Sequence, residues 1–215
     1  MVSHIQLNDK SDFGKNQKGN KPTSFCNWRL LRLKATSDLK NDHVTVRRLG
    51  AIVQNCSDKL YLNHNIPIED IELISVIIEE FVDKFHHGKE EQAYFPETQY
   101  KNNFGEDIRK FLIEHELGRR IARMLREHLN SWKNGKDSRE PVARFLKSYA
   151  VFITDHTGKE DKFFDLVDES KSLSEEEDRM LIRHYEKCHN QVGGKLRTEH
   201  MLKLIDHLEA KDWMK

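Results

Sequence analysis

The stretch "HHGKEEQAYFP" (residues 86–96) decides the fold, because the chain nearly repeats it as "HTGKEDKFFDL" (residues 156–166). In both copies a histidine is followed by Gly-Lys-Glu two residues later, and an aromatic residue comes four positions after the glutamate. A His-x-x-x-Glu pair places both side chains on one face of a helix, at a spacing that can hold one metal ion or bridge two. The repeat therefore predicts two helices that present the same pair of side chains to a common core.

Composition limits the kind of protein. The 215 residues are 37% hydrophobic, enough for one core of ordinary size, and 36 basic side chains balance 36 acidic ones. This balance leaves no field of one sign to attract nucleic acid or an anionic membrane surface. The longest apolar runs are too short to span a membrane, and the N-terminus lacks the apolar segment of a secretion signal. Cys26, Cys56 and Cys188 are far apart and odd in number, which favours reduced thiols in the cytoplasm. We expect no nucleic-acid or membrane partner, and the sequence does not indicate the oligomeric state.

Helical periodicity predicts the fold class. Apolar residues recur at steps of three and four over about 38–60, 68–95 and 105–132, and again from Pro141 onward. Pro141 suits a first helical turn, whereas Pro96 is expected to end the second helix. No stretch shows strand alternation, and the short connections favour antiparallel neighbours. We predict an all-α protein built on an antiparallel up-and-down four-helix bundle.

The chain is expected to divide into three parts. Residues 1–24 are rich in Lys, Asn and Gly and are predicted to be flexible. Residues 25–170 form the bundle, and residues 171–215 form a helical extension packed on it. Ser174 and Glu177 have the spacing of a capping box at the start of this extension.

Helix phase predicts which polar residues of the repeat face inward. His86 and Glu90 continue an apolar stripe spaced by four along the second helix, whereas His87 and Glu91 fall about 100° away on a polar face. In the fourth helix Glu160 continues the inner aromatic stripe.

Histidines of the other helices join these groups. His43 lies on the inner face of the first helix and His115 within the apolar series of the third. Any one of these histidines alone would be read as a core residue with a hydrogen-bond partner. Converging from four helices, however, buried imidazoles and carboxylates without a compensating charge cost on the order of several kcal/mol per ion. A bound cation removes this cost, and the groups are too many for one tetrahedral site. They suit two transition-metal ions bridged by carboxylates. The predicted metal ligands are His43, His86, Glu90, His115, His156 and Glu160.

Four segments occur in register along the chain: "NDHVTVRRL" (41–49), "FHHGKEEQAYFP" (85–96), "IEHELGRRIARML" (113–125) and "YAVFITDHTGKEDKFF" (149–164). Together they resemble the hemerythrin-like HHE cation-binding family. The resemblance covers about residues 39–166 and implies a non-haem di-iron centre. In that centre His43, His86, His115 and His156 would be terminal imidazoles, and Glu90 and Glu160 would be bridges.

The chain departs from the oxygen-carrying hemerythrins at Arg119, where those proteins have a second third-helix histidine. Another group or solvent must fill this place. Tyr149, two turns before His156 on the same inner face, is the candidate, and a hydrogen-bonded core aromatic is the alternative role for it. His87 and Glu91 would replace His86 and Glu90 if the second helix were rotated. Asp161 is the alternative to Glu160, because the oxygen-carrying members use a carboxylate five residues after their fourth-helix histidine.

The resemblance implies two iron ions that bind or sense dioxygen or a related small oxidant such as peroxide. An enzyme that acts on peroxide or oxidises a substrate is an alternative, favoured by the more open iron that a missing imidazole would leave. A helical interaction module with a structural metal is a second alternative. Zinc and manganese also accept imidazole and carboxylate ligands.

Overall fold

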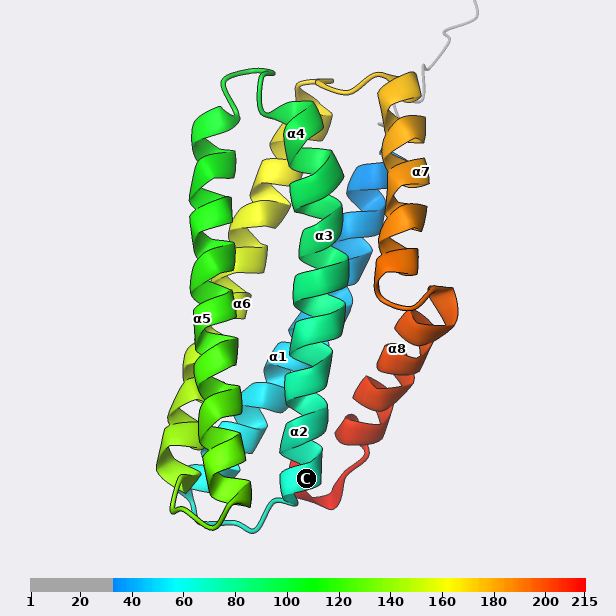
Figure 1. Cartoon of the computed structure of the whole chain (residues 1–215). Coiled ribbons are helices and arrows are strands. Elements are labelled where there is room, and N and C mark those ends of the chain that lie inside the picture. Colours follow the sequence, from blue (N-terminus) through cyan, green and yellow to red (C-terminus); the bar gives the residue numbers. More distant parts are fainter. Residues whose placement is uncertain (1–32) are drawn as a thin grey trace, which may run out of the picture. The chain divides into compact units, whose positions relative to one another are not determined.

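The computed structural model describes residues 33–215, and every regular element in this range is helical, which confirms the all-α prediction (Figure 1). Three long helices of the bundle are α1 (Lys34–Tyr61), α5 (Gly105–Lys133) and α6 (Arg139–Glu169). The predicted flexible segment 1–24 and Cys26 lie outside the described residues. Within residues 33–215, no helix is both long and apolar enough to cross a membrane.

The remaining bundle helix is continuous from Ile68 to Thr98 but changes its winding along the way. Its segments are α2 (Ile68–Ile77), the π-helix η1 (Ile78–His86), α3 (His87–Lys89), the π-helix η2 (Glu90–Tyr94) and α4 (Phe95–Thr98). A π-helix is wider than an α-helix, because its hydrogen bonds run to the fifth residue instead of the fourth. The predicted helix end at Pro96 is wrong by two residues. Pro96 follows the wide turn of η2 and lies in the first turn of α4, where its missing N–H group leaves no α-helical bond unmade.

Helices α7 (Glu175–Gln191) and α8 (Lys195–Glu209) pack against the bundle and lead into the short 3-10 helix η3 (Asp212–Met214). The predicted capping box is present: the Glu177 N–H donates to Ser174 Oγ over 3.3 Å, and the Ser174 N–H donates to Glu177 Oε2 over 2.7 Å. Helix α7 contacts α1, α3 and both π segments, and α8 contacts α1 and α2. The boundary between bundle and extension near residue 170 stays a prediction.

The apolar core consists of two clusters that lie at different levels along the bundle. In each bundle helix, the apolar residues before the predicted metal ligands belong to one cluster and those after them to the other. The pairs are Leu39 and Val46 in α1, Phe85 and Ala93 in the second helix, Phe111 and Ala122 in α5, and Ile153 and Phe163 in α6. A polar layer therefore lies between two apolar clusters, which exclude water from both sides.

Candidate metal centre

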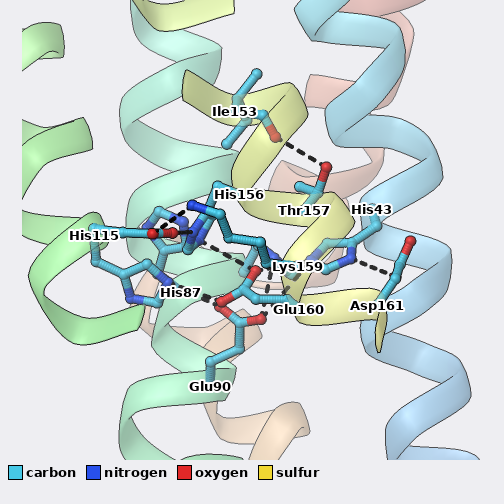
Figure 2. A network of polar contacts seen from close by, with 12 residues as sticks. His43, His87, Glu90, His115, Ile153, His156, Thr157, Lys159, Glu160 and Asp161 are labelled. Carbon is cyan, nitrogen blue, oxygen red and sulfur yellow. Dashed lines mark hydrogen bonds and ion pairs between the residues drawn. The ribbon is translucent and has the colours of Figure 1, made fainter. Parts of the chain in front are cut away.

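The polar layer contains five histidines and two glutamates, all at most 3% exposed. Its members come from all four bundle helices and converge on one point, as Figure 2 shows for the residues that it labels. They are His43, His86, His87, Glu90, His115, His156 and Glu160. The structure thus brings together all six side chains predicted from helix phase, and it adds His87.

The prediction that His87 lies on a polar face is wrong. Its ring is 97% buried and stacks on His115 with centroids 3.8 Å apart. An α-helix turns about 100° per residue, so adjacent residues cannot share a narrow face. The nine-residue π segment η1 ends immediately before His87, and its wider turns lag behind α-helical phase. The phase set by the preceding apolar stripe therefore does not carry over to His87, and His86 and His87 are both buried.

The Nε2 atoms of four histidines surround the two carboxylates. His86 Nε2 lies 3.5 Å from Glu90 Oε1, whereas His115 Nε2 lies 3.5 Å from the other oxygen, Oε2. Glu160 makes the same kind of link: its Oε1 is 3.3 Å from His115 Nε2, and its Oε2 is 3.3 Å from His43 Nε2. Each carboxylate therefore spans the space between histidines on opposite sides of the layer.

Each of the five histidines has a carboxylate behind its Nδ1 atom. Two of these contacts are 2.7 Å from His115 to Glu91 and 2.8 Å from His43 to Asp161. The others are His156 to Glu114 at 2.8 Å and His86 to Asp42 at 3.4 Å, whereas Asp83 Oδ1 lies 3.6 Å from His87 Nδ1, too far for a hydrogen bond. A carboxylate at Nδ1 fixes the tautomer that leaves Nε2 free as an electron-pair donor, and it makes the imidazole a better metal ligand.

The lysines of the two repeats have a role in this arrangement that the sequence does not reveal. The Lys89 ammonium, only 2% exposed, donates to Asp42 over 2.7 Å, and Asp42 in turn lies behind His86. In the second copy, Lys159 donates over 2.7 Å to Glu114, the carboxylate behind His156. Each His-x-Gly-Lys-Glu copy thus provides a histidine, the glutamate beside it, and a cation that holds the carboxylate behind the histidine.

The surroundings of the two glutamates shift their pKa values in opposite directions. Burial and then repulsion from Glu160 raise the pKa of Glu90 well above its usual value. Burial also opposes ionisation of Glu160, but the charge on His156 and the hydrogen bond with His115 outweigh it and hold that pKa well below its usual value. Burial lowers the pKa values of His86 and His87, which keeps these rings neutral and able to donate an electron pair.

The layer is not satisfied by protein groups alone. The atoms without a hydrogen-bond partner are Nε2 of His43, His86, His87 and His156, Nδ1 of His87, both oxygens of Glu90, and Oε2 of Glu160. Leaving even one buried polar atom unpaired costs about 1–3 kcal/mol. The side chains of the layer offer potential ligand atoms in two groups, and within each group these atoms lie within 4.8 Å of one another: His43, His86, Glu90 and Glu160 in one, and His87, His115 and His156 in the other. The donor set fits two cations.

A sequence model of the hemerythrin HHE cation-binding domain matches residues 34–167. The chain belongs to this family. Comparison with curated proteins and with solved structures found no match. Hemerythrin-like domains of this family are helical and bind metal cations, which agrees with the paired donor groups in the layer.

The other residues singled out in the sequence lie around the polar layer. Asp161 faces away from the two donor groups and bonds His43 Nδ1 and Arg47, whereas Glu160 faces inward, as helix phase predicts. Tyr149 is buried and outside both donor groups. Arg119 bonds Asp83 and Glu91 over 2.7 Å each, so it supports the carboxylates behind His87 and His115.

Sequence reasoning gave His87 only as a replacement for His86 and not as an additional member of the layer, and one signal could have found it. The third helix lacks an imidazole at Arg119, and an adjacent second histidine stands in "HH" on the neighbouring helix. A change in helix phase is needed to turn both of these histidines inward. A strict α-helical period of 3.6 residues per turn contains no such change.

Proposed function

We propose that this chain holds two iron ions in its polar layer and uses them to bind or sense dioxygen or a related small oxidant. The observation that carries the proposal is the set of buried Nε2 and carboxylate oxygen atoms that have no hydrogen-bond partner. Each histidine of the layer also has a carboxylate behind its ring. One ion would be held by His43 and His86, and the other by His87, His115 and His156. Glu90 and Glu160, which face both groups, would bridge the ions.

Iron bound here would supply redox chemistry and a coordination position for the oxidant. The chain supplies the rest. The outer carboxylates orient the imidazoles, and the two apolar clusters exclude bulk water. His87 fills the gap left by Arg119, so the layer holds as many imidazoles as the resemblance leads one to expect of an oxygen carrier. For this reason we place binding or sensing ahead of a peroxide-consuming enzyme.

Metal content tests the ligand assignment. We expect two ions per chain in protein expressed with ample iron, and loss of at least one ion in His87→Ala and in Glu160→Ala. The exposed His64 provides a matched control, because His64→Ala should keep both ions. Full occupancy in both core variants would show that the layer is not the metal site.

Optical spectroscopy tests the function itself. Protein loaded anaerobically with ferrous iron should develop new near-ultraviolet charge-transfer bands on exposure to air. A loaded protein that shows no such bands would contradict oxidant binding. Rapid oxygen evolution from hydrogen peroxide, absent in His156→Ala, would favour the enzyme instead.

We further propose a cytoplasmic location. Cys56 and Cys188 are buried free thiols, as expected of a protein in a reducing compartment. Cell fractionation tests this, and recovery with an oxidising compartment would contradict it.

A further inference from the structure

A long groove lies between α5 and α6 on the surface of the bundle. Two cavities form it, of about 560 Å³ and about 360 Å³, and Glu114 and Lys159 line both. The α6 residues that line this α5–α6 groove extend from Arg144 to Leu166, which is about 33 Å of helix at 1.5 Å per residue. Helices α7 and α8 pack mainly on α1 and the second bundle helix, and α5 lies on the far side of the bundle from them (Figure 1). The C-terminal helices therefore leave the groove open.

Exposed apolar side chains follow the groove. Leu117 of α5 is 50% exposed, and Val151 and Leu166 of α6 are 60% and 51% exposed. All three line the groove, and the half-buried Ile121 and Phe152 complete the apolar lining of its larger cavity. Apolar residues scattered singly over a surface carry no meaning, whereas several gathered in one groove mark a site at which another molecule binds.

The charged residues of the groove leave an excess of positive charge. Five basic side chains line it against three acidic ones. Lys147 and Lys162 are exposed, and neither makes an ion pair with another residue of the described range 33–215. Acidic side chains of an occupant would therefore meet unpaired partners on this surface.

The groove also includes side chains that hold one of the predicted metal ligands in place. Glu114 Oε2 lies 2.8 Å from His156 Nδ1, and Glu114 Oε1 accepts a hydrogen bond of 2.7 Å from Lys159. The Phe152 ring stacks on the His156 ring, with centroids 5.2 Å apart. An occupant of the groove would thus contact the two residues that fix the orientation of His156.

Shape and charge together favour a helix as the occupant. A length of about 33 Å corresponds to roughly 22 residues of α-helix, and an amphipathic helix that lays its apolar face in a groove is a recurring mode of protein recognition. A second copy of this chain fits less well. In a twofold-symmetric contact the same surface meets itself, so the surplus of positive charge would face an equal surplus.

We propose that the α5–α6 groove binds an acidic amphipathic helix of a partner protein, and that Glu114 and Phe152 couple this contact to the ion on His156. The coupling rests on the proposed metal centre, whereas the docking surface does not. A cation on His156 Nε2 draws electron density from the ring, which strengthens the hydrogen bond from Nδ1–H to Glu114. Glu114 then holds Lys159 less tightly, and Lys159 is freer to pair with the helix. We expect the metal-loaded chain to bind the helix more tightly for this reason.

A synthetic peptide of about 22 residues is a suitable probe, with leucine at every third or fourth position and glutamate and alanine elsewhere. Its binding to the full chain is followed by fluorescence anisotropy. Val151→Glu and Lys147→Glu should each weaken binding about tenfold, and a peptide with lysine in place of glutamate should bind about tenfold more weakly. The matched controls are Val44→Glu on α1 and Lys187→Glu on α7. They change an exposed valine and an exposed lysine that do not line the groove, so binding should stay the same.

The coupling is tested with iron-loaded and chelated protein. The loaded chain should bind the acidic peptide about fivefold more tightly, which is near the lower end of typical coupling between two sites. Equal affinities of the two forms would overturn the coupling. A chain that binds no metal would overturn the proposed function and the coupling, and the groove variants would still decide the docking surface.

The docking surface itself has two outcomes that would overturn it. One is a peptide that does not bind, or that binds equally well to the wild type and to both groove variants. The other is a dimer of the chain in analytical ultracentrifugation that Val151→Glu dissociates, because a second copy would then occupy the groove.

Discussion

Replacing Glu90 with glutamine should stabilise the metal-free protein while it impairs metal binding. Both carboxylate oxygens of Glu90 lack hydrogen-bond partners, and its side chain is fully buried. Burial and repulsion from Glu160 raise its pKa, so without metal the folded chain favours the protonated form. A raised pKa means that the associated stability is complete below the unfolded value, about 4.3 for glutamate, and is lost as pH rises toward the folded value.

The gain in the free energy of unfolding expected for Glu90→Gln has an upper bound. If Glu90 stays protonated in the folded state at pH 7 and ionises on unfolding, the cost is at most about 1.36 × (7.0 − 4.3), or about 3.7 kcal/mol. Glutamine has nearly the same shape and no such cost. At about 2–4 °C per kcal/mol for a chain of this size, Glu90→Gln should raise the melting temperature by up to about 7–15 °C at pH 7. Near pH 4 the gain should vanish.

The adjacent glutamate is the matched control, with the opposite sign. Glu91 accepts hydrogen bonds of 2.7 Å from both His115 Nδ1 and Arg119 Nη2. These bonds outweigh partial burial and lower its pKa. Glu91→Gln should therefore destabilise the metal-free protein, by about 1–2 kcal/mol.

Circular dichroism melts of chelated protein between pH 4 and 8, with metal content measured in parallel, test both variants. A metal-free Glu90→Gln protein less stable than the wild type at pH 7 would refute the reasoning. A gain that persists unchanged at pH 4 would refute it as well.

Three further predictions concern stability. Chelation of the wild type should lower its melting temperature, since ions at a hundredfold excess over Kd add about 3 kcal/mol, and an unchanged melt after confirmed metal removal would contradict this. Gly118→Ala should destabilise the fold by about 1–3 kcal/mol in thermal melts, because the new Cβ would lie 2.6 Å from the Phe152 ring. In the control variant Gly158→Ala the new Cβ meets nothing within 4 Å, so this variant should be more stable by about 0.5–1 kcal/mol. Stability changes of the same sign in the two variants would count against the packing argument. Hydrogen bonds from Lys101 and the capping box lower the pKa of Glu177 to about 2, so its contribution of about 1 kcal/mol or less is complete above pH ~4.3 and lost as pH falls toward 2. In melts of metal-free protein from pH 7 to 2, the deficit of Glu177→Gln should disappear over that window, and a constant deficit would contradict the assignment.

Local rules account for most of the fold and for six of the seven residues in the layer. A spacing of three and four places apolar residues on one helical face wherever the backbone is α-helical, as it is throughout α1, α5 and α6. The inward orientation of His43, His115 and His156 follows from this periodicity alone. The capping box at Ser174 is equally local, because its partners are three residues apart.

The orientation of His87 could not follow from the same rule. The rule assumes 3.6 residues per turn, and η1 and η2 do not keep that period. The same assumption explains the error at Pro96, which follows η2. Both errors therefore have one cause, a change of helical winding beside the polar layer.

The sequence by itself determined the repeated His-x-x-x-Glu pairs, their placement on inner faces and the all-α bundle, because each depends on backbone geometry over a few residues. Only the tertiary structure decided that His87 joins the layer and that the other four histidines each have a carboxylate from another helix behind them. Asp161 reaches His43 across 118 positions of sequence, and Glu114 reaches His156 across 42. Such partners are selected by how neighbouring helices pack side chains around a buried polar group that must be satisfied, and no spacing within one helix records that choice.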